Sequence, residues 1–246
     1  MNSHVRATGA LRTLVSAAAC GALLGLGGCA SETIFQSSFN TQAVGTVPSA
    51  TQATGTAQVA GDPGSVVIAG PVPGSSENWV KIGRTNAQQS AVAKFIGNTS
   101  KTPGIGTYNF LGALFIPSGK DVDATVEFDT SAHGQPASTG FLHLDFASNK
   151  EGQNVVRIND DASNTWGTFP RDQFFTLSVN LEITASSAVA HMALLGTGTS
   201  GTKDFTIPSP FNNFAQQFGQ VQVYMGFPWT GSFEATDLLV THRTDK

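Results

Sequence analysis

The sequence predicts an all-β protein in which two antiparallel sheets pack face to face as one β-sandwich. Apolar and polar residues alternate with period two in five stretches, which is typical of strands with one buried face and one polar face. Only 12% of the residues are charged, whereas 17 are phenylalanine and 27 are glycine, and this composition favours strands and turns over helices. About 200 residues follow the N-terminal segment, which is enough for one such core.

The first 28 residues have the features of an export signal. Arg6 and Arg12 are their only charged side chains, and an apolar stretch runs from Leu14 to Leu26. This stretch is shorter than the ~20 apolar residues that span a bilayer. The segment closes on Leu26-Gly27-Gly28-Cys29, which resembles the lipobox of bacterial lipoproteins, although Gly27 stands where Ala or Ser is commoner. The resemblance implies that Cys29 is lipidated.

The expected organisation is a signal peptide over residues 1–28, a lipidated cysteine and short tether over 29–32, and one β-sandwich domain over 33–246. In the lipoprotein family an Asp after the lipidated Cys retains many proteins at the inner membrane, and Ala30 stands there instead. The resemblance therefore implies the bacterial cell envelope, at the outer membrane, with the membrane as a partner through the N-terminal lipid. An ordinary secretory signal with a chance cysteine is the alternative.

Charge and cysteine content exclude several functional classes. Two of the 13 Lys and Arg residues lie in the signal, which leaves 11 against 17 Asp and Glu, a net charge of −6 with His neutral. An acidic chain without a basic cluster is not expected to bind nucleic acid. Cys20 leaves with the signal and Cys29 would carry lipid, so the expected domain has no thiol for a disulfide, a zinc site or nucleophilic catalysis.

Short apolar and β-branched runs predict the strands of the N-terminal half, at 34–40, 65–69, 79–82, 91–96 and 108–116. Residues 41–56 are rich in Thr, Gly and Ala and are expected to form a loop. The clearest alternation predicts strands at 122–129, 141–146, 156–158, 176–183 and 220–225. One helix is expected near 210–218, where Ser209 can cap it and Pro210 suits its first position.

Residues 231–241 are expected to form a closing strand with the pattern Phe-x-x-x-Asp-Leu-x-Val. This strand, the opening strand with Phe39-Asn40 and the alternating strands between them resemble the concanavalin A-like jelly rolls, which include laminin G domains, lectins and glucanases. The resemblance covers most of the mature chain and rests on pattern and length, with no diagnostic motif. It implies that the first and last strands pair side by side.

Glu127 and Asp129 share one strand face, about 6.7 Å apart along the strand. Glucanases of the resembled fold use a Glu-x-Asp-x-Glu strand whose two Glu residues are nucleophile and acid. Here only the first two positions match, because Ser131 replaces the second Glu, and Asp145 or Glu182 would have to supply the missing acid. The simpler interpretation is a solvated outer face.

His143 and Asp145 also share a strand face. With Glu127 or Asp129 they could bind a divalent cation through nitrogen and oxygen ligands. Calcium, bound by Glu127, Asp129 and Asp145, is the cofactor that these residues suggest. A solvated strand with an incidental ion pair is the alternative.

Aromatic and amide side chains in expected loops form a third candidate site. Rings suited to stacking on sugars are those of Trp166, Phe169, Tyr224 and Trp229. The loop cluster most typical of a binding site contains Asn154, Asn159, Asp160, Asp161, Asn164 and Trp166. Its alternative is a hydrophilic turn with one aromatic ring packed at the core edge.

The predicted function is non-catalytic binding of a glycan or another envelope component by a lipid-anchored, lectin-like sandwich. Two alternatives stay open. One is a glycoside hydrolase or lyase of the same fold that uses Glu127 and Asp129. The other is a structural or assembly lipoprotein that docks an envelope protein.

Overall fold

The computed structural model describes residues 31–97, 105–119, 122–131, 139–184, 186–196, 201–207, 217–226 and 228–244. The predicted signal and Cys29 lie outside these residues. No helix within the described ranges is long and apolar enough to cross a membrane. Residues Ser31–Lys246 form one compact unit.

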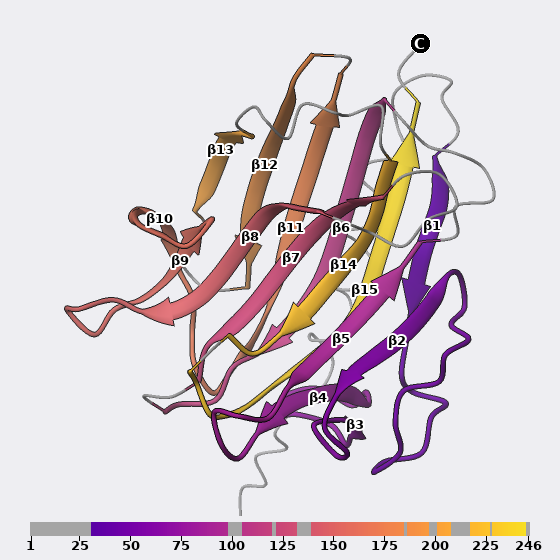
Figure 1. Ribbon diagram of the computed structural model, residues 1–246, viewed down its shortest axis with the longest axis vertical. Helices are drawn as coiled ribbons and strands as arrows, with labels where there is room; N and C mark the ends of the chain where they lie inside the picture. Colours follow the sequence, from indigo (N-terminus) through magenta and orange to yellow (C-terminus); the bar gives the residue numbers. More distant parts are fainter. Residues whose placement is uncertain are drawn as a thin grey trace, which may run out of the picture. The chain divides into compact units, whose positions relative to one another are not determined.

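Two antiparallel sheets make up this unit (Figure 1). The eight-stranded sheet contains, in order, β13 (Thr202–Thr206), β12 (Ala188–Leu195), β11 (Phe174–Ile183), β6 (Gly106–Phe115), β15 (Gly231–Arg243), β4 (Trp79–Arg84) and β3 (Val66–Ala69), and β1 (Glu32–Ser37) also pairs with β15. The seven-stranded sheet contains, in order, β10 (Asp161–Thr168), β9 (Asn154–Ile158), β8 (Thr139–Ser148), β7 (Ala124–Ser131), β14 (Gln217–Tyr224), β5 (Ala91–Ile96) and β2 (Thr56–Gly61).

The closing strand β15 organises the eight-stranded sheet. One of its edges pairs with β6, while the other pairs first with β4 and then with β1. The register with β6 shifts between Thr236 and Leu239, where Asp237 has a φ of 52°. This bulge bends the long strand between its two partners. Because β1 pairs with β15, the pairing of first and last strands that the family resemblance implied is confirmed.

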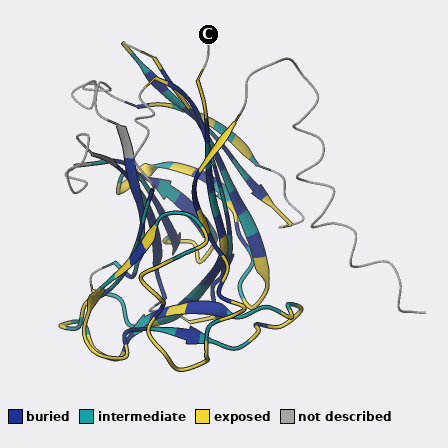
Figure 2. Ribbon diagram, turned by 90° about the vertical axis from the view of Figure 1, so that its right-hand side faces the viewer, coloured by how far each residue is buried: buried dark blue, intermediate teal, exposed yellow. Residues whose placement is uncertain are grey.

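Side chains from the facing sides of the two sheets form the core, and Figure 2 shows buried residues along both layers. Phe110 on β6 meets Phe128 on β7 edge to face, with ring centroids 5.2 Å apart. Phe146 on β8 meets Phe175 on β11 at 5.6 Å. These ring contacts join the two sheets, as period-two burial in facing strands requires.

All strands predicted from alternation are present, and the predicted sandwich is confirmed. Four strands were not predicted, namely β2, β10, β12 and β13. Most of the helix expected near 210–218 lies outside the described residues, but its end is wrong, because Gln217 and Phe218 belong to β14 and Gly219 lies within that strand. Pairing of Gln217 with Ser131 and of Phe218 with Thr130 on β7 overrides the local helical pattern.

Candidate functional site

Antiparallel pairing of β14, β7 and β8 gathers polar residues on the side of the seven-stranded sheet that faces away from the core. The cross-strand rows are Gln220–Asp129–Gly140, Gln222–Glu127–His143 and Tyr224–Thr125–Asp145. Val126 and Phe128, which alternate with the β7 residues in these rows, are fully buried in the core. We call the following side chains the polar face: Thr125, Glu127, Asp129, His143, Asp145, Asp160, Gln220, Gln222 and Tyr224.

The polar face is more buried than a solvated strand face, which was the simpler interpretation of the sequence. Asp129 is 2% exposed and Asp145 is 8% exposed, while Glu127 and His143 are partly buried. Crowding by long side chains on the neighbouring strands removes these carboxyl groups from water. Buried carboxyl groups need hydrogen-bond partners, and the partners define the site.

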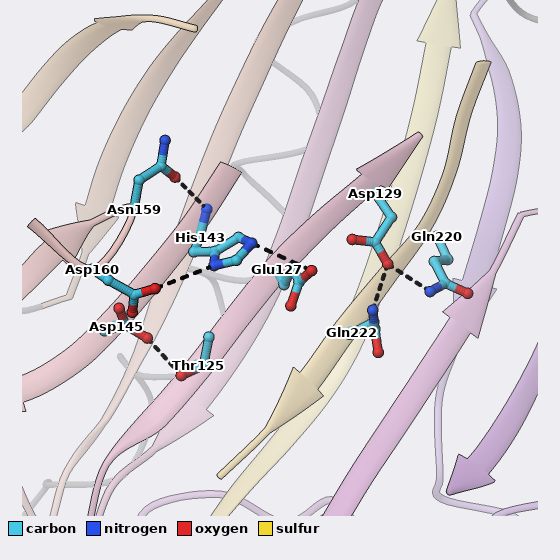
Figure 3. Close-up of polar contacts among 9 residues, drawn as sticks. All are labelled: Thr125, Glu127, Asp129, His143, Asp145, Asn159, Asp160, Gln220 and Gln222. Atoms are coloured by element: carbon cyan, nitrogen blue, oxygen red, sulfur yellow. Dashed lines mark hydrogen bonds and ion pairs between the residues drawn. The ribbon is translucent and has the colours of Figure 1, made fainter. Parts of the chain in front are cut away.

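His143 lies between two carboxylates (Figure 3). Its Nε2 is 3.3 Å from Glu127 Oε1, and its Nδ1 is 3.9 Å from Asp160 Oδ2. The hydrogen bond with Glu127 raises the pKa of His143, although burial opposes this shift. Burial raises the pKa of Glu127, but the hydrogen bonds with His143 and Asp129 outweigh it and lower that pKa to about 2. Glu127 is therefore an ionised acceptor at every physiological pH.

The turn between β9 and β10 places Asp160 beside His143. Asn159 and Asp160 have φ values of 54° and 59°, the left-handed pair of a two-residue type I′ hairpin, which Asn and Asp tolerate best after glycine. Asn159 is fixed to His143 twice: its Oδ1 accepts from the His143 backbone N–H at 2.8 Å, and its own N–H donates to the His143 carbonyl at 3.0 Å. The turn therefore sets the second partner of the imidazole.

Asp129 has the opposite protonation behaviour to Glu127. Its Oδ2 accepts from the side-chain amides of Gln220 at 2.6 Å and Gln222 at 2.5 Å. Its Oδ1 is buried and accepts no hydrogen bond from the residues that the structure describes. Burial raises the pKa of Asp129 to about 6, and the neighbouring Glu127 adds to this effect against the two Gln bonds. Below about pH 6, a carboxyl that retains its proton thus lies beside one that does not.

Two further groups complete the polar face. Thr125 Oγ1 donates to Asp145 Oδ1 at 2.6 Å, and burial together with Asp160 raises the pKa of Asp145 to about 6. Burial and the charge of Glu127 raise the pKa of Tyr224, so its phenol remains a donor that hydrogen-bonds to Glu127. Glu127 is therefore surrounded by groups that donate to it.

Gly140 provides the space for the central ion pair. A Cβ at this position would collide with Glu127 Oε1 and lie 2.6 Å from His143 Nε2. The substitution Gly140→Ala is expected to separate the two groups and to lower the pKa of His143 toward its ordinary value. The unfolding free energy should fall by only about 1 kcal/mol, because both displaced groups end flexible side chains. NMR titration of the His143 ring measures the effect.

The matched control for this prediction is Gly70→Ala, because a Cβ at Gly70 meets nothing within 4 Å. It should leave the His143 titration unchanged. An unchanged His143 pKa in Gly140→Ala would contradict the role given to this glycine.

The structure corrects the aromatic part of the predicted site. Trp166 lies in β10 and Phe169 follows it, and both are buried in the core, so neither ring can stack on a ligand. Trp229 packs partly against the core, and its carbonyl accepts from Arg84. Of the four predicted rings, that of Tyr224 belongs to the polar face, since Tyr224 pairs with Thr125 on β7.

The predicted loop cluster is dispersed. Asp160 belongs to the polar face, and Asn159 accepts from the His143 backbone N–H beside it. Asn154 Oδ1 instead accepts from Arg171 Nε at 2.9 Å, and Asp161 Oδ1 accepts from the Ser163 backbone N–H within β10. Asn164 lies within β10 as well. Glu182 lies on the eight-stranded sheet, where its Oε1 is 3.7 Å from His191 Nε2, so it cannot supply an acid to Glu127.

A metal ion has little support at the polar face. The described residues contain no group of three or more His, Cys, Asp or Glu side chains that could hold one. Of the three carboxylates considered for calcium, Asp129 is engaged by Gln220 and Gln222, and Asp145 by Thr125.

No protein-family model matches the chain, and no curated protein matches its sequence. In fold it is similar to peanut lectin solved with a nine-residue peptide, with a TM-score of 0.51 and 12% identity over 89% of this chain and 98% of the lectin. It is also similar to the catalytic domain of a glycoside hydrolase family 131 protein from Coprinopsis cinerea, with a TM-score of 0.52 and 13% identity over 85% and 94% of the chains.

A carbohydrate esterase from the Shiga toxin-encoding bacteriophage phi24B is a third similar structure. Its TM-score is 0.52 and its identity 11%, over 87% of this chain and all of the esterase chain (100%). At these identities the likeness shows the concanavalin A-like β-sandwich fold. The activity of this chain has to be inferred from its own residues.

Proposed function

We propose that the domain binds carbohydrate on the polar face. The observation that carries the proposal is the set of donors and acceptors fixed on three paired strands around Glu127. Sugar hydroxyls both donate and accept, and this face offers an ionised carboxylate together with imidazole, phenol and amide donors. Groups held by paired strands are positioned more precisely than groups on loops. Similarity to peanut lectin and to two carbohydrate-active enzymes supports the assignment.

The same proposal places the domain at the outer membrane of a bacterial envelope through a lipid on Cys29. The sequence Leu26-Gly27-Gly28-Cys29 and the apolar segment before it support this location. The mature chain is acidic, so acyl chains rather than attraction to anionic lipid headgroups would hold it, at about 0.8 kcal/mol per buried CH₂.

The charge of the polar face favours neutral over acidic glycans. Four of its nine side chains are carboxyl groups, at Glu127, Asp129, Asp145 and Asp160. Glu127 is ionised at every physiological pH, so a uronate or a sulfate ester beside it would meet like charge. We therefore expect the ligand to present hydroxyl groups here.

A panel of neutral, sulfated and uronate-containing glycans tests the proposal on residues Ser31–Lys246. One class of neutral glycan is expected to bind. Glu127→Gln should weaken that binding at least about tenfold, since it removes the charge from the central acceptor. Glu182→Gln, on the other sheet, is the matched control and should bind as the unchanged domain does. A blank panel would reject carbohydrate binding and favour a protein partner.

Glycoside hydrolysis or elimination is the second candidate, and the divergent pKa values of Glu127 and Asp129 favour it. When two neighbouring carboxyl groups have pKa values of about 2 and about 6, the first can act as a base or nucleophile while the second retains a proton. The second Glu of the glucanase pattern is absent at Ser131. The same panel, assayed for new reducing ends and unsaturated products, tests this candidate, and full activity in Glu127→Gln would reject it.

A further inference from the structure

A groove of about 580 Å³ lies on the eight-stranded sheet. Its lining comes from the β2–β3 turn, β3, β4 and the residues at and just before the start of β15, and it includes Ser65, Val67, Lys81, Gly83, Thr230 and Ser232. Val80 and Ile82, which alternate with Lys81 and Gly83 along β4, are fully buried in the core. The groove therefore opens on the outer side of this sheet, away from the polar face of the other sheet.

Fixed hydrogen bonds hold the walls of the groove. The guanidinium of Arg84 donates to the backbone carbonyls of Gln89, Gly226 and Trp229, which ties the loop after β4 to the loop before β15. The β2–β3 turn is closed by the Ser65 N–H, which donates to the Asp62 carbonyl at 3.0 Å. Such a site is preformed, so a ligand would spend little free energy on ordering it.

Two polar side chains of the groove form no hydrogen bond with the residues that the structure describes. Lys81 is exposed and forms neither a hydrogen bond nor an ion pair with any residue that the structure describes. Ser65 is 7% exposed, and its buried Oγ has no hydrogen-bond partner in the described part of the chain. A buried hydroxyl without a partner is costly unless a ligand or water satisfies it.

The charge of the groove is opposite to that of the protein. Its lining contains the cations Lys81 and Arg84 and no carboxylate, whereas the whole chain has 17 acidic against 13 basic residues. Glu234 is the cross-strand partner of Lys81 but does not line the groove. Burial raises the pKa of Glu234, although the positive charge of Lys81 acts to lower it. The other lining groups are mainly hydroxyls and glycine backbone, which suit a hydroxylated ligand better than an apolar one.

We propose that this groove binds the anionic group of an acidic sugar, whether carboxylate, sulfate ester or phosphate ester. Lys81 Nζ pairs with the charge, and Ser65 Oγ donates to one of its oxygens. Because the groove and the polar face lie on different sheets, the proposal stands independently of carbohydrate binding at Glu127.

Calorimetric titration of the full chain with galacturonate, galactose 6-sulfate, galactose 6-phosphate and galactose tests the proposal. At least one charged sugar should bind about tenfold more tightly than galactose, and which one does so identifies the anion. Lys81→Gln should reduce its affinity to that of galactose, Lys81→Arg should retain most of it, and Ser65→Ala should weaken it about threefold.

A matched control separates this site from the polar face. Lys94→Gln removes a lysine from β5 of the seven-stranded sheet and should leave the affinity for the charged sugar unchanged. Equal binding of all four sugars, or equal loss in Lys81→Gln and Lys94→Gln, would overturn the proposal.

Discussion

The domain is expected to lose stability as the pH rises from about 4 to about 7. Burial is the main cause that raises the pKa of Asp123 to about 7 and those of Asp129, Asp145 and Asp237 to about 6. The unfolded chain releases these protons near pH 4, so unfolding becomes easier until the folded carboxyl groups ionise as well. Glu127, with a lowered pKa of about 2, acts oppositely and contributes stability that is lost below about pH 4.5. Because four acids with raised pKa values outweigh this one, the optimum should lie at or below about pH 4.

Asp129→Asn isolates the contribution of one buried acid. Asparagine keeps an oxygen acceptor for Gln220 and Gln222 and can donate toward Glu127, as the protonated Asp129 does. Relative to the unchanged domain, the variant should be more stable by on the order of 3 kcal/mol at pH 8 and nearly equally stable at pH 4, since each pKa unit corresponds to about 1.4 kcal/mol.

Urea unfolding at pH 4, 6 and 8 measures both effects. Glu151→Gln, at an exposed turn position, is the control and should follow the unchanged domain at every pH. Stability that rises from pH 4 to pH 8, or an Asp129→Asn variant that gains nothing at pH 8, would contradict the burial assigned to these carboxyl groups.

Phe128→Ala is expected to lower the unfolding free energy by about 3–5 kcal/mol. Phe128 is fully buried and its ring meets Phe110 across the two sheets. The loss combines the transfer free energy of the ring with the cost of the cavity that remains. It is a large fraction of the unfolding free energy of a typical domain, which is ~5–15 kcal/mol. Glu127 and Asp129 flank this residue on β7, so the same ring also supports the strand that positions them.

Phe174→Ala is the matched control, because Phe174 is 37% exposed and its ring meets Trp79, which belongs to a small cluster outside the main core. Its cost should remain below about 1.5 kcal/mol. Urea unfolding of both variants measures the difference, and a cost below about 1 kcal/mol for Phe128→Ala would show that this ring does not join the sheets.

Local periodicity predicted the strands that carry the polar face. Alternation in 122–129 correctly placed Glu127 and Asp129 on one side of their strand, and alternation in 141–146 did the same for His143 and Asp145. That the two pairs meet depends on the register of β7 with β8, which no local pattern encodes. The burial of this face, and hence its pKa values, depends on the same register.

The missed strands have physical explanations. Register shifts in β10 between Asp161 and Thr165 and between Trp166 and Thr168 break the period of two, so the segment resembled a loop. Asn159-Asp160 was the available signal for that hairpin. In β12 the inward positions include Ala188 and Ala190, whose small side chains give little hydrophobic contrast. The groove at Lys81 joins segments far apart in the chain and had no sequence signal.

Carbohydrate bound on the polar face of the seven-stranded sheet can be located by NMR spectra of residues Ser31–Lys246, recorded with the neutral glycan that the panel selects. The side-chain amides of Gln220 and Gln222 and the ring of His143 are expected to shift on binding, while the ring of His191 on the eight-stranded sheet is not. Shifts confined to His191 and its sheet, or no shift at His143 with saturating glycan, would exclude binding at the polar face.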